Sequence, residues 1–282
     1  MLASTRDLVH AAWAASPRYG VLAFNVIGLE HASAIIAGAE AGHAPVILQV
    51  SQNTVRYWDG LLAPLAAACV ALAERASVPV AVHLDHATEI GLCEEAIGSG
   101  VSSIMFDASA SSLEENTRRT ASIVTWAHER GVAIEGEIGI VGGKDGVPSS
   151  TETYTDPREA ADFVDATNVD LLAVAIGTEH GMVDRHAVLD LDRLDALAAA
   201  VDVPLVLHGS SGVPLDGIPE VVRRGMTKIN VATQLNAAYT QAIRATLAAR
   251  PDITDPRIYG SEGRHAVTEV VRRYCELVRP EG

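Results

Sequence analysis

Apolar and polar positions alternate along this chain on two length scales. Short apolar runs recur, and between them lie longer, Ala-rich stretches whose apolar residues are spaced three or four apart. The short runs predict buried strands and the longer stretches predict helices. The predicted strands cover residues 19–24, 45–50, 78–82, 103–106, 132–136, 171–175, 204–207 and 228–229. The predicted helices cover residues 5–15, 31–41, 61–75, 90–99, 113–130, 157–166, 191–200, 218–224, 235–249 and 264–278.

This regular succession of strand and helix predicts an α/β fold with parallel strands. Eight such units in 282 residues are typical of a (β/α)8 barrel, which averages about 250 residues. A doubly wound sheet is the competing architecture, but the first strand is not followed by GxGxxG, the dinucleotide-binding motif. No linker rich in Pro, Gly or Ser divides the chain. We therefore expect one TIM-barrel domain over residues 1–282, with additional helices at the termini.

Polar residues stand where nearly every predicted strand ends. One or two of them could simply cap a strand, but polar residues at nearly every end predict a binding site, because parallel barrels bind ligands at the carboxyl ends of their strands. These residues are Asn25, Ser51, Asp85, His86, Asp107, Glu137, His180, His208 and Asn230.

Three of these strand ends carry a histidine. His86, His180 and His208 follow three different apolar runs. Three neutral imidazoles that leave a fourth position open are the ligand set of a catalytic zinc. His83 shares a strand face with Asp85, and its side chain either packs in the barrel or orients a neighbour.

The carboxylates beside these histidines have two interpretations each. Asp85 can carry a proton to or from a substrate hydroxyl, or it can accept a hydrogen bond from an imidazole. Asp107 and Glu137 can hold a second divalent metal, or they can orient the histidines. The sequence leaves both alternatives open.

Segments of mostly small and polar residues follow the last two predicted strands. His208-Gly209-Ser210-Ser211-Gly212 follows one strand, and Asn230-Val231-Ala232-Thr233 follows the other. A plain turn would explain the first segment alone, but in this barrel the loops after strands 7 and 8 frequently bind phosphate. Gly177 and Gly181 flank the segment that carries His180 and allow a bent loop. Residues 139–150 are also glycine-rich and predict a long loop that could act as a lid.

Composition excludes several kinds of partner. The net charge of −15 and the pI near 5.0 argue against nucleic acid, which needs a basic face. No apolar run reaches the ~18 residues of a membrane helix, and the N-terminus is not a convincing signal peptide. The three cysteines are widely spaced, so a disulfide framework is not expected. We expect a cytoplasmic protein without nucleic-acid or membrane partners.

Several ordered motifs, spread over most of the chain, resemble those of class II, metal-dependent ketose-bisphosphate aldolases. They are AFNV from Ala23, HLDH from His83, EGEIG from Glu135, AVAIGTEHG from Ala173, VPLVLHGSSG from Val203 and KINVAT from Lys228. The resemblance implies reversible aldol cleavage of a fructose- or tagatose-1,6-bisphosphate-like substrate to dihydroxyacetone phosphate and glyceraldehyde 3-phosphate. The Asn-Val-Ala-Thr segment looks closer to the tagatose type.

The resemblance also implies roles for individual residues. Zinc would lie on the three histidines, Asp85 would be the proton donor, and Asp107 and Glu137 would match a second metal position. A monovalent cation, Na+ or K+, often lies nearby, and the family forms homodimers or homotetramers. The dihydroxyacetone-phosphate site would comprise Gly181, Gly209, Ser210, Ser211, Asn230, Val231, Ala232 and Thr233, and we add Asn25 and Ser51 as substrate-binding candidates from their strand ends.

The chain departs from the family pattern in two places. The family's mobile loop usually carries an acid soon after Gly-Gly, whereas this chain reads Gly-Gly-Lys-Asp-Gly; Asp145 is the candidate substitute. Residues 51–53 and 87–88, near the aldehyde side, also differ from common members. Arg264 resembles a basic residue that serves the distal phosphate.

Other mechanisms and functions remain alternatives at this point. Lys228 could form a Schiff base, but it begins a predicted strand, at the wrong end of the barrel. A metal-dependent barrel hydrolase often has His-x-His at strand 1, which Phe24-Asn25-Val26 lacks. An aldolase of a related ketose phosphate with a different aldehyde, or a non-catalytic sugar-phosphate binder, would also fit the motifs.

Overall fold

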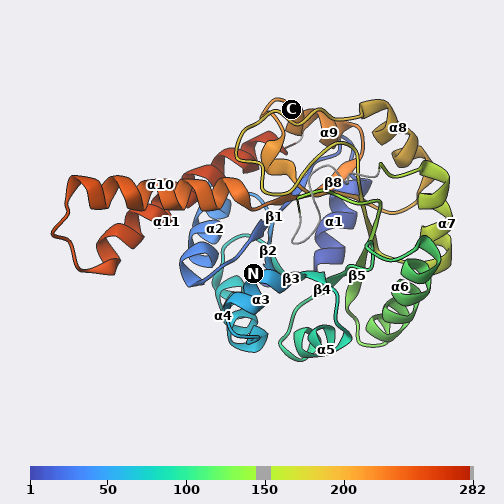
Figure 1. Cartoon of the computed structure of the whole chain (residues 1–282), viewed down its shortest axis with the longest axis horizontal. Coiled ribbons are helices and arrows are strands. Elements are labelled where there is room, and N and C mark those ends of the chain that lie inside the picture. Colours follow the sequence, from blue (N-terminus) through green and yellow to red (C-terminus); the bar gives the residue numbers. More distant parts are fainter. Residues whose placement is uncertain (144–153, 280–282) are drawn as a thin grey trace.

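The computed structural model describes residues 1–143 and 154–279, and its strands close into one parallel barrel in sequence order (Figure 1). The predicted α/β barrel is therefore confirmed. The strands are β1 Val21–Asn25, β2 Val46–Ser51, β3 Val80–Ala87, β4 Ser103–Phe106, β5 Ala133–Ile138, β6 Leu171–Val174, β7 Leu205–Leu207 and β8 Met226–Val231.

Helices surround the barrel, and two long ones extend from its side (Figure 1). The extended pair, α10 and α11, pack along each other, and α11 also packs on α2. None of the described helices is both long and apolar enough to cross a membrane. The helices are α1 Thr5–Ala14, α2 Leu29–Ala41, α3 Gln52–Tyr57, α4 Leu62–Arg75, α5 Ile90–Gly98, α6 Leu113–His128, α7 Pro157–Thr167, α8 Leu191–Ala200, α9 Gly217–Arg223, α10 Thr233–Ala249 and α11 Pro256–Leu277.

The inside of the barrel changes from apolar to polar along the strands. Its lower part is a small apolar cluster that includes Ala23, Ile47 and Ala81, and α1 packs against this cluster through Val9 and Ala12. Side chains on one face of a strand recur every second residue. At the next one or two inward-facing positions along these strands, the residues are polar. The barrel therefore has a dry, packed floor and a polar mouth.

Several elements differ from their predicted ranges; β3, for example, extends to Ala87 rather than ending at residue 82. The short helix α3 was not predicted; Ser51 caps it by accepting a hydrogen bond from the Thr54 amide. The helix predicted to begin at residue 264 begins at Pro256, with Asp255 as its N-cap. Strand β8 begins at Met226, two residues before its predicted start, so Lys228 lies inside the strand.

A candidate metal and phosphate site at the barrel mouth

Three histidines from three βα junctions meet at the mouth of the barrel. The ring centroids of His86 and His208 are 4.8 Å apart, those of His86 and His180 are 5.3 Å apart, and those of His180 and His208 are 5.8 Å apart. One ring nitrogen from each histidine lies within 4.8 Å of the other two. The structure thus brings together the three residues that the strand-end pattern singled out.

The backbone at His86 explains why two neighbouring residues face the same cavity. His86 has φ of +53°, a left-handed conformation that is uncommon for a residue other than glycine. The register between β3 and β4 shifts between Leu84 and Ala87. Successive side chains of a regular strand point to opposite faces, but this irregularity lets Asp85 and His86 line one cavity.

Glycines allow the loops around His180 to approach one another. Gly143 has φ of +79°, and a Cβ placed there would lie 2.4 Å from the His180 carbonyl oxygen. Gly209 has φ of +65°, and its Cβ would lie 2.7 Å from the Glu179 carbonyl oxygen. Any side chain at these positions would force the loops apart, so the glycines set the position of His180.

Two carboxylates lie on the β4–β5 side of the histidines. The Asp107 Oδ2 atom is 3.0 Å from His86 Nδ1, and the Glu137 Oε2 atom is 3.5 Å from His208 Nδ1. The Ser109 hydroxyl donates to both carboxylates. With His86 these carboxylates form a second group with metal-ligand geometry, so each of the two roles considered from the sequence is compatible with their positions.

A buried ion pair lies directly below the histidines. Glu135 and Lys228 are both 0% exposed, and their charged atoms are 2.8 Å apart. Glu135 accepts a hydrogen bond from His208 Nε2 at 2.9 Å, which leaves Nδ1 of that ring for a metal. Lys228 donates to the Asn230 side chain at 2.8 Å. The pair therefore holds a candidate ligand and a cavity-lining amide at once.

Lys228 is unsuited to Schiff-base chemistry for a different reason from the one inferred from the sequence. Its side chain reaches the polar layer of the barrel, not the wrong end, but its ammonium group is buried and held by Glu135 and Asn230. His83 lies in the same layer, where Ser103 Oγ is 2.7 Å from its Nδ1. Burial lowers the pKa of His83 well below the usual value, so this ring is neutral.

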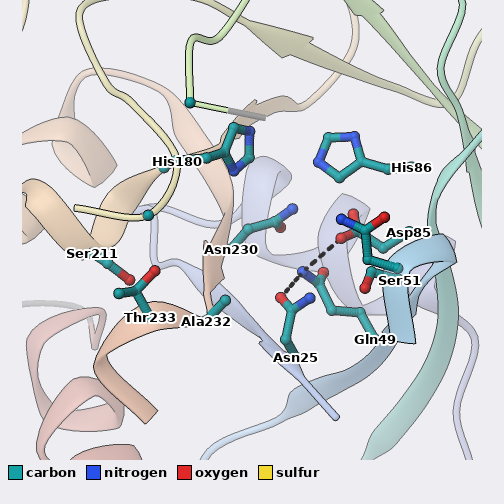
Figure 2. A pocket seen from close by; sticks show the side chains of 14 residues that line it. Asn25, Gln49, Ser51, Asp85, His86, His180, Ser211, Asn230, Ala232 and Thr233 are labelled. Atoms are coloured by element: carbon teal, nitrogen blue, oxygen red, sulfur yellow. Dashed lines mark hydrogen bonds between the residues drawn. The ribbon is translucent and has the colours of Figure 1, made fainter. Parts of the chain in front are cut away.

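Asp85 faces the cavity beside His86 (Figure 2). Gln49 lies between Asp85 and Asn25: its amide donates to Asn25 Oδ1 at 2.6 Å and to Asp85 Oδ2 at 3.4 Å. The other carboxylate oxygen, Oδ1, is buried and accepts no hydrogen bond from a described residue. This oxygen is therefore placed to interact with a ligand.

The opposite side of the cavity has the features of a phosphate site. Its lining includes Gly181, Gly209, Ser211, Ala232 and Thr233 (Figure 2). Helix α10 begins here, and no side chain in the described part of the chain caps its first amides. The N-terminus of a helix with unpaired amides attracts anions.

Two predicted substrate residues do not line this cavity. The Ser210 hydroxyl is buried and donates to the Asn230 carbonyl, so it joins the two loops. Val231 is buried in the core between the barrel and the helices. Both residues support the phosphate loops from behind.

The remaining predicted site residues lie in different places. Asn25, Ser51 and Asn230 line the cavity as predicted. Asp145 lies outside the described residues. Arg264 is on α11 and does not line the described part of the cavity.

Sequence reasoning missed Gln49 and Glu135. Both interrupt apolar runs at inward-facing positions, and that interruption was the available signal.

The residues present fit a metal ion with borderline-soft character. Three imidazoles that converge from separate loops suit zinc, and the hydrogen bond from Glu135 to His208 is the kind of support that metal-binding histidines usually have. The adjacent carboxylates suit a harder cation.

Comparison with known proteins agrees with this geometry. The model of the class-II fructose-bisphosphate aldolase family matches residues 3–282. The fructose-bisphosphate aldolase of Geobacillus stearothermophilus is 39% identical over 256 residues, with 90% of this chain and 89% of the relative covered. A probable fructose-bisphosphate aldolase of Bacillus subtilis is 40% identical over 255 residues, with 90% of each chain covered.

Solved structures show the same similarity. The YdjI aldolase of Escherichia coli K12 superposes with a TM-score of 0.85 at 33% identity, over 99% of this chain and 97% of that one. A putative fructose-1,6-bisphosphate aldolase of Coccidioides immitis gives 0.86 at 31% identity, over 97% and 95%. Because the family match runs almost from end to end, this chain belongs to the class II fructose-bisphosphate aldolase family, which is generally metal-dependent, and is itself an aldolase, a carbon–carbon lyase.

Proposed function

We propose that the protein cleaves a ketose 1,6-bisphosphate reversibly to dihydroxyacetone phosphate and glyceraldehyde 3-phosphate, with zinc held by His86, His180 and His208. The observation that carries this proposal is the cluster of three imidazoles, of which His86 and His180 line one cavity together with Asp85 and a phosphate-type loop. The names of the relatives, fructose-bisphosphate aldolases, support the substrate class.

Each part of the cavity has a role in this proposal. The backbone amides near Gly209 and Thr233, with the Ser211 hydroxyl, bind the phosphate of the dihydroxyacetone-phosphate half. Asn25, Ser51, Gly181, Asn230 and Ala232 complete the binding surface. A bound Zn2+ would act as a Lewis acid at the substrate carbonyl and stabilise the negative charge that develops as the C3–C4 bond breaks.

Asp85 carries the proton at C4. In cleavage its carboxylate takes the proton from the C4 hydroxyl, which becomes the aldehyde oxygen, and in condensation it returns that proton. The buried oxygen that no described residue bonds supports this role, and Gln49 fixes the other oxygen. Asp145 remains our candidate for the acid that moves the proton of dihydroxyacetone phosphate.

We also propose further ions, an oligomeric state, a domain organisation and a location for this protein. Asp107 and Glu137 would bind a second divalent metal, and a Na+ or K+ ion would lie near the phosphate loops. We also propose a homodimer or homotetramer, a single barrel domain over the whole chain and a cytoplasmic location. Sedimentation analysis and the dependence of the rate on K+ test the oligomer and the cation.

A substrate panel tests the proposed reaction. Fructose 1,6-bisphosphate, tagatose 1,6-bisphosphate and their 1-phosphates are incubated with the enzyme, and dihydroxyacetone phosphate is detected by a coupled assay. We expect cleavage of at least one bisphosphate. Absence of cleavage for the whole panel would contradict the proposed substrate class, and the ratio between the two epimers would assign the stereochemistry at C4.

A further inference from the structure

A chain of buried hydroxyl groups connects helix α1 to the polar layer of the barrel. Thr5, the first residue of α1, and Ser103 of β4 are both 0% exposed. The Ser103 hydroxyl donates to Thr5 Oγ1 at 2.7 Å, and Thr5 Oγ1 is 3.0 Å from Ser102 Oγ. At its other end the chain reaches His83, whose Nδ1 is 2.7 Å from Ser103 Oγ. Helix α1 thus contacts the barrel through a polar chain as well as through the apolar floor.

The bond at one end of the chain fixes the direction of all the others. A hydroxyl group has one hydrogen to donate, and Ser102 donates its hydrogen to the Val82 carbonyl at 3.1 Å. Ser102 Oγ therefore accepts from the Thr5 hydroxyl, and Thr5 Oγ1 accepts from Ser103. Because Ser103 has then used its own hydrogen, its oxygen accepts from Nδ1 of His83. The proton of the His83 ring consequently lies on Nδ1.

The other nitrogen of this ring is left as an acceptor. Burial, and after it the charge of Lys228, lowers the pKa of His83 well below the usual value, so the ring carries a single proton. Its Nε2 atom is buried and has no hydrogen-bond partner among the described residues. Glu135 Oε2 lies 3.9 Å away, but two acceptors cannot bond to each other. His83 therefore does not compete for the Glu135 carboxylate.

Both oxygens of Glu135 are used elsewhere. Oε1 accepts from His208 Nε2 at 2.9 Å, and Oε2 is 2.8 Å from the Lys228 ammonium group. If the proton of His83 lay on Nε2, the ring would present a donor 3.9 Å from Oε2. A small movement of the carboxylate would then form a new hydrogen bond and weaken the existing one to His208. The tautomer of His83 thus decides which groups the carboxylate holds.

We propose that Thr5 and Ser103 are positioning residues, which hold His83 as the Nδ1-protonated tautomer and thereby reserve Glu135 for His208. Neither hydroxyl lines the described part of the cavity, so both act through other side chains. The consequence for the metal rests on the proposed zinc site, whereas the tautomer of His83 does not.

Nuclear magnetic resonance measures this tautomer directly. In the zinc-loaded, full-length protein with isotope-labelled histidine, two-bond proton–nitrogen correlations distinguish a protonated ring nitrogen from an unprotonated one. The signals of His83 are those that disappear in His83→Gln. We expect the wild-type ring to carry its proton on Nδ1. A wild-type ring protonated on Nε2 would overturn the proposal.

Variants of Thr5 alter the chain without touching His83. Thr5→Val removes the acceptor of the Ser103 hydrogen, which can then turn to His83 Nδ1, so we expect the ring proton to move to Nε2. Thr5→Ser keeps a hydroxyl and should keep the wild-type tautomer. Ser103→Ala removes the acceptor of the Nδ1 proton and should also move it to Nε2. A proton that stays on Nδ1 in both Thr5→Val and Ser103→Ala would show that the chain does not set the tautomer.

Competition with a chromogenic chelator measures the consequence for zinc. The partners of metal-binding histidines are worth about 10–100-fold in affinity, so we expect the lower end, about tenfold weaker binding, in Thr5→Val and Ser103→Ala. Thr5→Ser should bind zinc like the wild type. Thr167→Val is the matched control, because Thr167 is equally buried but its hydroxyl donates to the Phe163 carbonyl within α7. It should keep both the tautomer and the zinc affinity.

The two measurements separate this inference from the proposed function. A shifted tautomer with unchanged zinc affinity would contradict the reservation of Glu135 for His208. A wild type that has the Nδ1 proton but binds no zinc would contradict the proposed function and support the hydroxyl chain. Circular dichroism checks the fold of each variant, and Ser103→Ala decides the outcome if Thr5→Val does not fold.

Discussion

At the scale of single residues, neighbouring polar groups of the site have different roles. Asp85 and His86 are adjacent in sequence, yet one presents a carboxylate oxygen that accepts no hydrogen bond from a described residue and the other joins the histidine cluster. Below them, Glu135 and Lys228 do not line the cavity but hold His208 and Asn230. Residues that would touch the ligand and residues that position them therefore form separate layers.

The Asp85→Ala variant tests the proton-transfer role. We expect kcat to fall by at least ~100-fold, the lower range for general acid–base catalysis. Bound zinc, measured by metal analysis, should remain at the wild-type level, because the three imidazoles are unchanged. Unchanged turnover with full metal content would remove Asp85 from this role.

The buried ion pair yields a prediction with its own matched control. Lys228→Met leaves the buried Glu135 carboxylate without its cationic partner, and we expect a loss of about 3–5 kcal/mol in the free energy of unfolding. The double variant Glu135→Leu/Lys228→Met removes both charges and should recover much of that stability. It should still bind zinc about 10–100-fold more weakly, because His208 has lost its acceptor.

Denaturant unfolding and competition with a chromogenic chelator measure the two quantities. Zinc affinity in the double variant equal to that of the wild type would show that Glu135 does not support His208. A double variant no more stable than Lys228→Met would contradict the charge-pair explanation.

The sequence was enough to predict which strand-end residues meet at the site. It was not enough to predict the hydrogen bonds between them. His86, His180 and His208 follow apolar runs, and their positions at one barrel face follow from parallel topology. The support of His208 by Glu135 depends on which inward positions share a layer, and that is set by strand register. Register is not visible in a single sequence, so Glu135 and Gln49 were missed.

At the scale of elements, loops that approach closely determine the shape of the site. Gly209 places the loop after β7 against the backbone of Glu179, next to His180. The helix α3 turns back at Ser51, which itself lines the cavity. These features depend on backbone conformations that only a few residue types adopt.

The Gly209→Ala variant tests the role of this approach. The added Cβ would lie 2.7 Å from the Glu179 carbonyl oxygen, so the phosphate loop must shift. We expect the KM for the ketose bisphosphate to rise at least ~10-fold, since loss of even one hydrogen bond to a charged group is of this size. Steady-state kinetics provide the measurement.

Gly131→Ala is the matched control for that substitution. Gly131 has a similar φ of +72°, and a Cβ there would meet nothing within 4 Å. It should lose about 1 kcal/mol of stability from backbone strain and keep its KM. Equal KM values for the two variants would show that the close approach at Gly209 is unimportant for binding.

Element boundaries were predicted well where capping signals were clear and poorly where glycines intervened. Helix α7 begins at Pro157 after its cap Asp156, as predicted. Helix α11 has the same Asp-Pro start, but Gly260 and Gly263 within it disguise its first turns. Close packing explains Gly263, because a Cβ there would lie 2.7 Å from the Tyr239 ring. Tertiary contact thus overrides helix propensity in this segment.

At the scale of the whole molecule, the residues that stabilise the barrel and the residues of the candidate site lie in different parts of it. Its floor is apolar and is packed by α1, while its mouth carries the histidines, the carboxylates and the phosphate-type loops. Substitutions at the mouth can change metal and substrate binding without removing the core. In the sequence, the apolar runs correspond to the packed floor and the polar residues at their ends correspond to the mouth.

Removal of metal tests the central claim most directly. The enzyme is treated exhaustively with a chelator, its secondary structure is checked by circular dichroism, and cleavage of the preferred ketose bisphosphate is measured before and after Zn2+ is added back. We predict that the metal-free protein stays folded, loses its cleavage activity and regains it with Zn2+, because the three imidazoles position the ion that stabilises the developing charge. Full cleavage activity in the folded, metal-free protein would contradict this account.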